Sequence, residues 1–316
     1  MTQEDEEGRG QVPDSLSPAP VSGILNLDKP AGWTSFDVVA FVRRRTHVRR
    51  VGHAGTLDPA ATGVLPLLLG QATRLAEYLV DATKVYEATI ELGLETDTYD
   101  AEGEVLRRAD AAGVSREAVE VALFRFQGEI DQAPPPYSAL KREGVPLYKR
   151  ARRGEDVQTA PRRVRADRLD IISYEPPVLR VEVECGKGFY VRSLAHDLGA
   201  ALGVGGCLVA LRRTRVGPFR VEDAVDIETL RREIESGEWR ERLFPPDEVL
   251  LGWRAAIVGA ANEERLSHGH ALSLQPLPGA TAIPGDRCRA YGLAGDFLAV
   301  LRCAGGLQWR PEKVFT

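Results

Sequence analysis

The sequence predicts a mixed α/β (α+β) fold of about two domains, the second of which is small and rich in strands. Two segments, 85–92 and 178–185, alternate apolar with polar residues, which is typical of half-buried strands. Segment 191–202 places its apolar residues three and four positions apart, which predicts a helix. After about residue 245 the chain becomes rich in Gly and Pro and its apolar runs shorten, which predicts a small, mostly β domain at 250–316.

Length and composition indicate a soluble globular protein. The chain has 316 residues, of which 43% are hydrophobic and 28% charged, so it can form about two domains with a large core. No apolar run approaches the ~20 residues of a membrane helix, and the acidic N-terminus does not resemble a secretion signal. The four cysteines are scattered, with no C-x-x-C pair. We therefore expect neither a metal site nor a disulfide framework, and a cytoplasmic location.

Positive charge is concentrated although the net charge is -5. Five arginines between residues 43 and 50 have no acid among them, and segment 141–168 holds ten Lys or Arg against four Asp or Glu. The acids gather in the N-terminal tail and in 227–241. This separation is what a polyanion-binding face on a mildly acidic protein would look like. For the arginines at 43–50, simple complementarity to the dipole of a preceding helix is an equally good interpretation.

The N-terminal part is predicted to be a tail, a strand and a helix. Residues 1–21 are charged and then rich in Pro, Ser and Gly, which predicts disorder. Residues 24–27 form a short apolar run that predicts a buried strand. Ser35 is a suitable N-cap for the helix that follows. The apolar face of that helix would be formed by Phe36, Val39 and Val42.

A glycine-rich segment at 52–65 presents Asp58. Three glycines indicate sharp bends or a close approach, and Pro59 pushes Asp58 toward an extended conformation. Asp58 should therefore project from a stiffened loop, ahead of a buried apolar run at 64–69. A lone carboxylate in such a place could be a nucleophile or an acid/base group, or it could hydrogen-bond its own turn.

The next elements are a helix at Gln71–Val80 and the strand at 85–92. Tyr86 falls on the inward face of that strand, where a tyrosine of the core is the default interpretation. The acidic turn at 95–103 lacks the twelve-residue ligand spacing of a calcium loop, so metal binding is not expected there. Ser115 should cap a third helix. The inward face of this helix would be formed by Val119, Ala122 and Phe126.

Segment 134–163 is irregular, stiffened by prolines and basic. Tyr137 and Tyr148 lie among its cations, and aromatics mixed with cations suit stacking on bases and pairing with phosphates. A solvated surface loop is the alternative.

Arg192 is placed against the dipole of its helix. Strands at 168–174 and 178–185 precede a glycine-flanked turn and the helix at 191–202, which Gly203 should end. Arg192 lies in the first turn of this helix, the end that disfavours a cation, which suggests a carboxylate partner. A last helix is expected at 226–237.

The motif Gly52-His53-x-Gly55-x-Leu57-Asp58-Pro59-x-Ala61-x-Gly63-x-Leu65 resembles the catalytic motif of the TruB family, the bacterial tRNA pseudouridine-55 synthases. The resemblance covers most of residues 22–220. Further matches in the same order are Leu27-Asp28-Lys29-Pro30, Thr96-Asp97-Thr98-x-Asp100, Tyr137-Ser138-Ala139-x-Lys141, Gly188-x-Tyr190-x-Arg192 and Leu211-Arg212-Arg213.

The resemblance implies the pseudouridine-synthase fold, with a mixed, mostly antiparallel central sheet flanked by helices and loops. It places a catalytic domain at 22–245, an RNA-clamping insertion at 134–163 and a PUA-like RNA-binding domain at 250–316. The C-terminal domain matches only loosely. Phe189 stands where many relatives carry a small hydroxyl residue.

The resemblance also implies an activity, the isomerisation of uridine to pseudouridine at position 55 in the T loop of tRNA. Asp58 would be the nucleophile on a flipped-out base, and Arg192 would pair with it and lower its pKa. Tyr86 would stack on the uracil and is a candidate acceptor of the C5 proton, although an ordinary tyrosine pKa near ~10 makes a poor base. The substrate-binding residues would be His53, Tyr190, Leu211 and Lys29.

The expected partner is the T arm of tRNA, with no cofactor, no metal and no protein partner, and the protein is expected to act as a monomer. Three other functions stay open. One is the guide-dependent relative that works in a box H/ACA particle, which the long 134–163 segment disfavours. The others are a non-catalytic tRNA-binding chaperone and a nucleoside hydrolase that uses Asp58.

Overall fold

The computed structural model describes residues 21–137, 141–142, 145–146, 160–275 and 281–315. Nearly all of the expected tail at 1–21, and most of the expected insertion at 134–163, lie outside the described residues. Among the described residues, no helix has the length and apolar character needed to cross a membrane.

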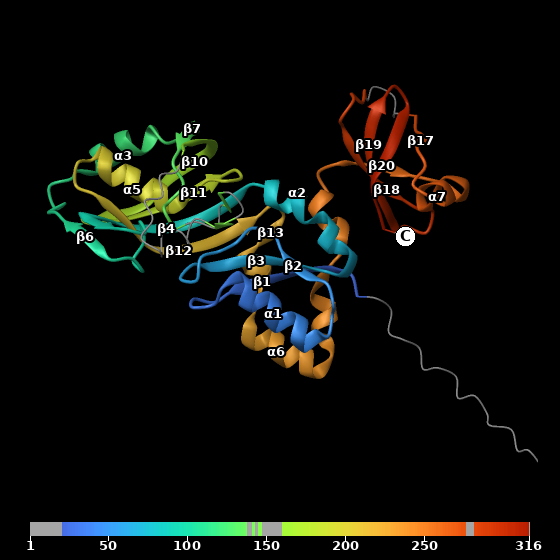
Figure 1. Cartoon of the computed structure of the whole chain (residues 1–316), viewed down its shortest axis with the longest axis horizontal. Helices are drawn as coiled ribbons and strands as arrows, with labels where there is room; N and C mark the ends of the chain where they lie inside the picture. The colour runs from blue at the N-terminus through green and yellow to red at the C-terminus, as the bar shows by residue number, and fades with distance from the viewer. Residues whose placement is uncertain (1–20, 138–140, 143–144, 147–159, 276–280, 316) are drawn as a thin grey trace, which may run out of the picture.

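One eleven-stranded sheet runs through the larger part of the chain (Figure 1). Only the pairs β1–β14 and β12–β3 are parallel, so the expectation of a mixed, mostly antiparallel sheet is confirmed. In spatial order its main strands are β14 (Val225–Asp226), β1 (Gly23–Lys29), β3 (Thr62–Leu69), β12 (Gly206–Val216), β4 (Lys84–Leu92), β11 (Val178–Cys185), β10 (Arg162–Glu175) and β7 (Gly128–Gln132). Attached to these are β2 (Val51–His53), β13 (Phe219–Arg220) and β15 (Leu243–Phe244).

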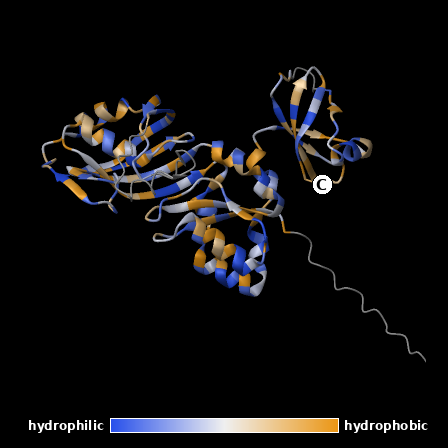
Figure 2. Ribbon diagram, viewed as in Figure 1, coloured by the Kyte–Doolittle hydropathy of each residue, from blue (hydrophilic) through white to orange (hydrophobic). Residues whose placement is uncertain are grey.

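Helices cover one face of each half of this sheet. Helices α3 (Arg116–Phe124) and α5 (Val191–Ala201) pack on the buried side chains of β4, β10 and β11. Helices α1 (Ser35–Thr46) and α6 (Ile227–Ser236) pack on β1 and β3. Figure 2 shows hydrophobic and hydrophilic residues interleaved along these elements, as expected for elements with one buried face.

The predicted alternation of β4 and β11 is confirmed. The two strands pair antiparallel, with Val181 opposite Ala88 and Val183 opposite Tyr86 on the covered face. The opposite face carries ion pairs, among them Arg180–Glu87 at 3.5 Å between the neighbouring β11 and β4, and Arg215–Glu184 at 2.5 Å from β12 to β11 across β4. The polar residues of the pattern therefore form the open face of the sheet.

The start of α1 differs from the sequence prediction by one residue. Thr34 is the N-cap and forms a capping box with Asp37, so Ser35 is already helical. Ser35 is buried and its hydroxyl bonds the backbone of Leu57. Phe36 points outward and is 66% exposed, so the prediction that it belongs to the buried face is wrong, and Val38 lies on that face with Val39 and Val42.

Two other helix predictions need correction. Segment 71–80 is not one helix but the 3₁₀ turn η1 (Gly70–Leu75) followed by the short α2 (Ala76–Asp81). Helix α3 ends at Phe124, so Phe126 packs on the core from the turn after it. The remaining short elements of this part are β5 (Leu94–Thr96), β6 (Val105–Arg108), β8 (Lys141–Arg142), β9 (Val145–Pro146), η2 (Val221–Asp223), η3 (Glu238–Arg242) and η4 (Pro246–Leu250).

The C-terminal residues form a second, five-stranded sheet. Phe297, Val300 and Phe315 join it to a hydrophobic cluster that also contains Leu250 and Tyr78 of the larger part. The strand order is β16 (Arg254–Ile257), β18 (Arg287–Tyr291), β19 (Phe297–Gly305), β20 (Gln308–Val314) and β17 (Leu272–Ser273), with helix α7 (Ala260–Ser267) alongside. The domain bounds of 22–245 and 250–316 remain predictions, and this small sheet is compatible with them.

Candidate active site

Asp58 lies in the loop between β2 and β3, outside any helix or strand, as the sequence predicts. Neighbouring elements hold this loop by its backbone. Ser35 bonds both backbone groups of Leu57, and the Pro59 carbonyl accepts from the Lys29 Nζ at 3.1 Å and from the Gly32 N–H at 2.9 Å. The loop is therefore fixed immediately before and immediately after Asp58.

Strand β3 meets β12 at Thr62 and Gly63, and the approach is closest at Gly63. Its φ is +101°, and a Cβ placed there would lie 2.1 Å from the carbonyl oxygen of Arg213. Only glycine fits both conditions. This close approach brings the end of the Asp58 loop against β12, the strand that carries Leu211 and Arg213.

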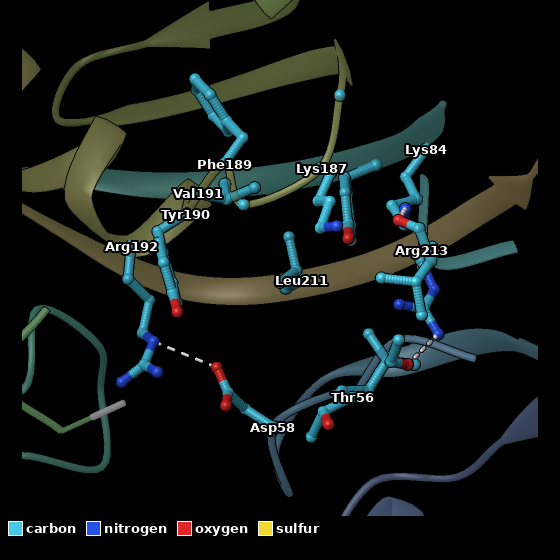
Figure 3. Close-up of a pocket in the computed structure, with 16 residues that line it drawn as sticks. Thr56, Asp58, Lys84, Lys187, Phe189, Tyr190, Val191, Arg192, Leu211 and Arg213 are labelled. Carbon is cyan, nitrogen blue, oxygen red and sulfur yellow. Dashed lines mark hydrogen bonds and ion pairs between the residues drawn. The ribbon is translucent and has the colours of Figure 1, made fainter. Parts of the chain in front are cut away.

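Arg192 holds Asp58 by an ion pair. Its Nε lies 3.0 Å from Asp58 Oδ2, and the side chain of Arg192 is only 7% exposed (Figure 3). The carboxylate partner that the sequence predicts for this arginine is therefore present. Helix α5 supplies Arg192 from its buried first turn.

Arg192 has a second carboxylate partner, Asp100, which sequence reasoning did not assign to the site. The Arg192 Nη1 lies 3.2 Å from Asp100 Oδ2, and its Nη2 donates to the Tyr137 carbonyl at 3.1 Å. Asp100 is held in turn by the Thr98 hydroxyl at 2.6 Å. The acidic turn thus serves to bring a carboxylate to Arg192, and no group of residues suited to a metal ion occurs in the described parts of the chain.

The pKa of Asp58 lies above its ordinary value. Burial raises it, Arg192 and Lys29 oppose that rise, and the nearby Asp100 adds to it. Arg192 acts with the expected sign, but loss of solvation around the carboxylate outweighs it. The predicted effect of Arg192 on the pKa of Asp58 is therefore present, but burial, which the prediction did not include, raises that pKa by more.

Asp58 and Arg192 line a cavity of about 310 Å³. In Figure 3 Arg192 and Tyr190 lie on one side of it, Lys84 and Arg213 on the other, and Leu211 between them. Tyr86 also lines the cavity. The structure thus brings together five of the seven predicted site residues.

His53 and Lys29 do not line this cavity. The His53 ring is half-buried in β2, its Nδ1 has no partner among the described residues, and burial, helped by Arg213, lowers its pKa. Lys29 is fully buried and donates to the carbonyls of Pro30, Trp33 and Pro59. In this structure Lys29 supports the loop of Asp58 through the Pro59 carbonyl.

The aromatic residues of the cavity are held by their surroundings. Gln132 pins the backbone of Tyr190, accepting from its N–H at 2.8 Å and donating to its carbonyl at 3.0 Å. Phe189, the residue that departs from the family pattern, is buried in the cluster under α5 and also lines the cavity. Burial raises the pKa of Tyr86, with Arg213 opposing the rise, so at neutral pH less of Tyr86 is present as the basic phenolate than for an exposed tyrosine.

Comparison with known proteins agrees with this geometry. The N-terminal domain of TruB family pseudouridylate synthases matches residues 43–191, and the C-terminal domain of tRNA pseudouridylate synthase B matches 192–251. A tRNA pseudouridine synthase B of Dehalococcoides mccartyi is 43% identical over 93% of this chain and 97% of its own. A tRNA pseudouridine synthase B of Pseudomonas aeruginosa is 49% identical over 82% of this chain and 86% of its own.

Two solved structures share the fold over 93% of this chain and 85% of theirs. One is an H/ACA RNP bound to a substrate RNA containing 2′-deoxyuridine, with 26% identity and a TM-score of 0.72. The other is a Cbf5-Nop10-Gar1 complex, with 28% identity and a TM-score of 0.71. Because the curated relatives match nearly the whole chain at more than 40% identity, the protein belongs to the TruB family of pseudouridylate synthases.

Proposed function

We propose that this protein isomerises uridine to pseudouridine at position 55, in the T loop of tRNA, with Asp58 as the nucleophile. The observation that carries the proposal is the ion pair of 3.0 Å between Asp58 and Arg192 beside a cavity lined by Tyr86, Tyr190 and Leu211. It occurs in a chain whose relatives are tRNA pseudouridine synthases B.

The isomerisation requires an ionised carboxylate beside the bond between sugar and base. The bond between N1 and C1′ breaks, the uracil turns, and C5 bonds to C1′ in its place. A proton leaves C5 and a proton is taken up at N1, so the reaction is an isomerisation without change of oxidation state. Asp58 can act by attack on the sugar or on the base, and Arg192 keeps its carboxylate ionised and oriented in either case.

The target nucleotide has to leave its stack to reach Asp58, at a cost of a few kcal/mol. Stacking on an aromatic side chain returns ~1–3 kcal/mol per base, and Tyr86, Phe189 and Tyr190 are aromatic residues that line the cavity. Phosphate contacts of the basic segment 134–163 would supply the rest. The start of that segment reaches the site, since the Tyr137 carbonyl accepts from Arg192.

Release of tritium tests this proposal. An unmodified tRNA transcript labelled with tritium at C5 of uridine should lose label stoichiometrically at position 55 when the protein is added alone. The H/ACA structures that share the fold make guide dependence the second candidate, which predicts no release without added RNA and proteins. A hydrolase would liberate free uracil, and a chaperone would bind the transcript without releasing label.

The activity should decline as the pH falls, with a midpoint above 3.8, the ordinary pKa of an aspartate. The sign follows from the active form. The protonated carboxyl cannot act as a nucleophile, and burial favours protonation, so the ionised form is lost at a higher pH than usual. Single-turnover rates between pH ~3 and ~8 would give the midpoint. Asp100→Asn removes a charge that raises this pKa and should move the midpoint down, whereas a midpoint at or below 3.8 in the intact protein would contradict the prediction.

A further inference from the structure

Two buried cations beside the cavity are held only by neutral groups. Arg213 is 1% exposed, and its Nε and Nη2 donate to the carbonyls of Val64 at 2.7 Å and Gly55 at 3.0 Å. Lys84 is 7% exposed, and its Nζ donates to the carbonyls of Val80 and Ala82 at 2.6 Å. Both residues line the cavity. Neither lies within 4.0 Å of a carboxylate in the described parts of the chain.

A buried charge without an opposite charge is rare because desolvation costs several kcal/mol, and proteins normally pair it. The other charges of the cavity follow that rule. Arg192 pairs with Asp58 and Asp100, and Lys187 pairs with Asp81 at 2.8 Å. Loss of solvation lowers the pKa of Lys84 to about 8, which still leaves it mostly charged at pH 7. The cavity therefore holds positive charge that nothing among the described residues neutralises.

An anion that neutralises Arg213 and Lys84 has to fit beside them without displacing their hydrogen bonds. A phosphate is a poor match because it needs several free N–H donors. The three N–H bonds of Lys84 are already directed at the carbonyls of Leu79, Val80 and Ala82, and three of the five N–H donors of Arg213 are engaged by two carbonyls and the Tyr86 hydroxyl, so few donors remain. A flat group with delocalised charge, stabilised through space, is the better match.

The proposed reaction produces such a group. When the bond between N1 and C1′ breaks, its electron pair stays with the base, and the uracil becomes an anion whose charge spreads over N1 and its two carbonyl oxygens. When the carboxylate adds to the base instead, the ring becomes an enolate. The ring is therefore negative while it is detached from the sugar on the first route, and once the carboxylate has added to it on the second.

We infer that Arg213 and Lys84 form a cationic wall, fixed before the substrate arrives, that stabilises the negative charge of the uracil ring during the isomerisation. The inference rests on the proposed function and adds to Asp58 and Arg192 a second electrostatic element on the opposite side of the cavity (Figure 3). Charges held in place in advance stabilise a developing charge without reorganisation, which makes such groups effective.

The effect of the cationic wall on a negatively charged base can be measured without turnover. A tRNA with 5-fluorouridine at position 55, bound to the Asp58→Asn variant, reports the ionisation of its own N3–H by fluorine NMR as the pH is raised. The cationic wall should lower the pKa of the bound base relative to the same complex with Arg213→Gln added, by about one unit or more. Arg213→Lys, which keeps the charge, should stay close to the parent, and Arg212→Gln is the matched control on the same strand. Arg212 is half-exposed, pairs with Asp28 at 2.7 Å and does not line the cavity.

The substitution of a buried arginine can prevent folding, so Lys84→Gln provides a second test. Its amide can still donate to a carbonyl of α2, and it too should raise the pKa of the bound base. Equal base pKa values in the parent and in the folded Gln variants would overturn the inference, as would equal values for Arg213→Lys and Arg213→Gln.

In the Asp58-containing protein, Arg213→Gln should lower the single-turnover rate by about 100-fold. Because the titration needs only bound RNA, it can fail while tritium release still succeeds.

Discussion

Asp58→Asn should abolish the release of tritium from C5-labelled tRNA, lowering the single-turnover rate by roughly 10⁴-fold or more, as removal of a nucleophile does in other enzymes. Asparagine has nearly the same shape as aspartate but neither the charge nor the nucleophilic oxygen pair of a carboxylate. The loop that carries it is fixed through Leu57 and Pro59, so the substitution changes the chemistry of position 58 and leaves its place unchanged.

The variant should stay folded and bind tRNA. Arg192 keeps Asp100 at 3.2 Å and the carbonyl of Tyr137 at 3.1 Å, so no buried cation loses all its partners. Equal melting temperatures and equal affinity for the transcript would establish this. Asp170→Asn is the matched control, since Asp170 is half-exposed and pairs with Arg168 on the open face of the sheet, and it should release tritium at the normal rate. Release of tritium by Asp58→Asn at the rate of this control would show that Asp58 is not the nucleophile.

Much of the site can be predicted from sequence because its residues follow local rules. Glycines and Pro59 indicate the loop of Asp58, and the alternation of β4 places Tyr86 on the covered face. Arg192 stands out because it opposes the dipole of its own helix. Each of these signals comes from residues close together in the chain.

The rest of the site depends on contacts that no local pattern records. Arg213 and Lys84 are bound by backbone carbonyls, which any sequence provides, so nothing in the neighbouring residues indicates their burial. Asp100 lies in a turn whose acids resemble an ordinary exposed loop until the fold brings it to Arg192. The pKa of Asp58 cannot be predicted from local sequence either. Its partner Arg192 can be named from the sequence, but the burial that raises the pKa cannot.

Arg192→Met should lower the rate of tritium release by about 10³-fold, close to the loss from one removed electrostatic contact in other active sites. Without the guanidinium, Asp58 and Asp100 face each other with no cation between them, which favours protonation of Asp58. Arg192→Lys should recover part of the rate, because an ammonium keeps the charge but cannot span both carboxylates and the Tyr137 carbonyl. A rate for Arg192→Met within about threefold of the unchanged protein would contradict this role.

The same substitution should decrease the free energy of unfolding by roughly 2–3 kcal/mol, measured by urea denaturation. This is less than the loss for a fully buried pair, because the side chain of Asp58 is 43% exposed. Adding Asp100→Asn separates the two effects of Arg192. The double variant should recover about 1 kcal/mol of stability, since one of the two facing carboxylates is gone, but it should remain as inactive as Arg192→Met. Recovery of the rate together with the stability would mean that Arg192 acts on the reaction only by neutralising Asp100, and its bond of 3.0 Å to Asp58 would then have no part in catalysis.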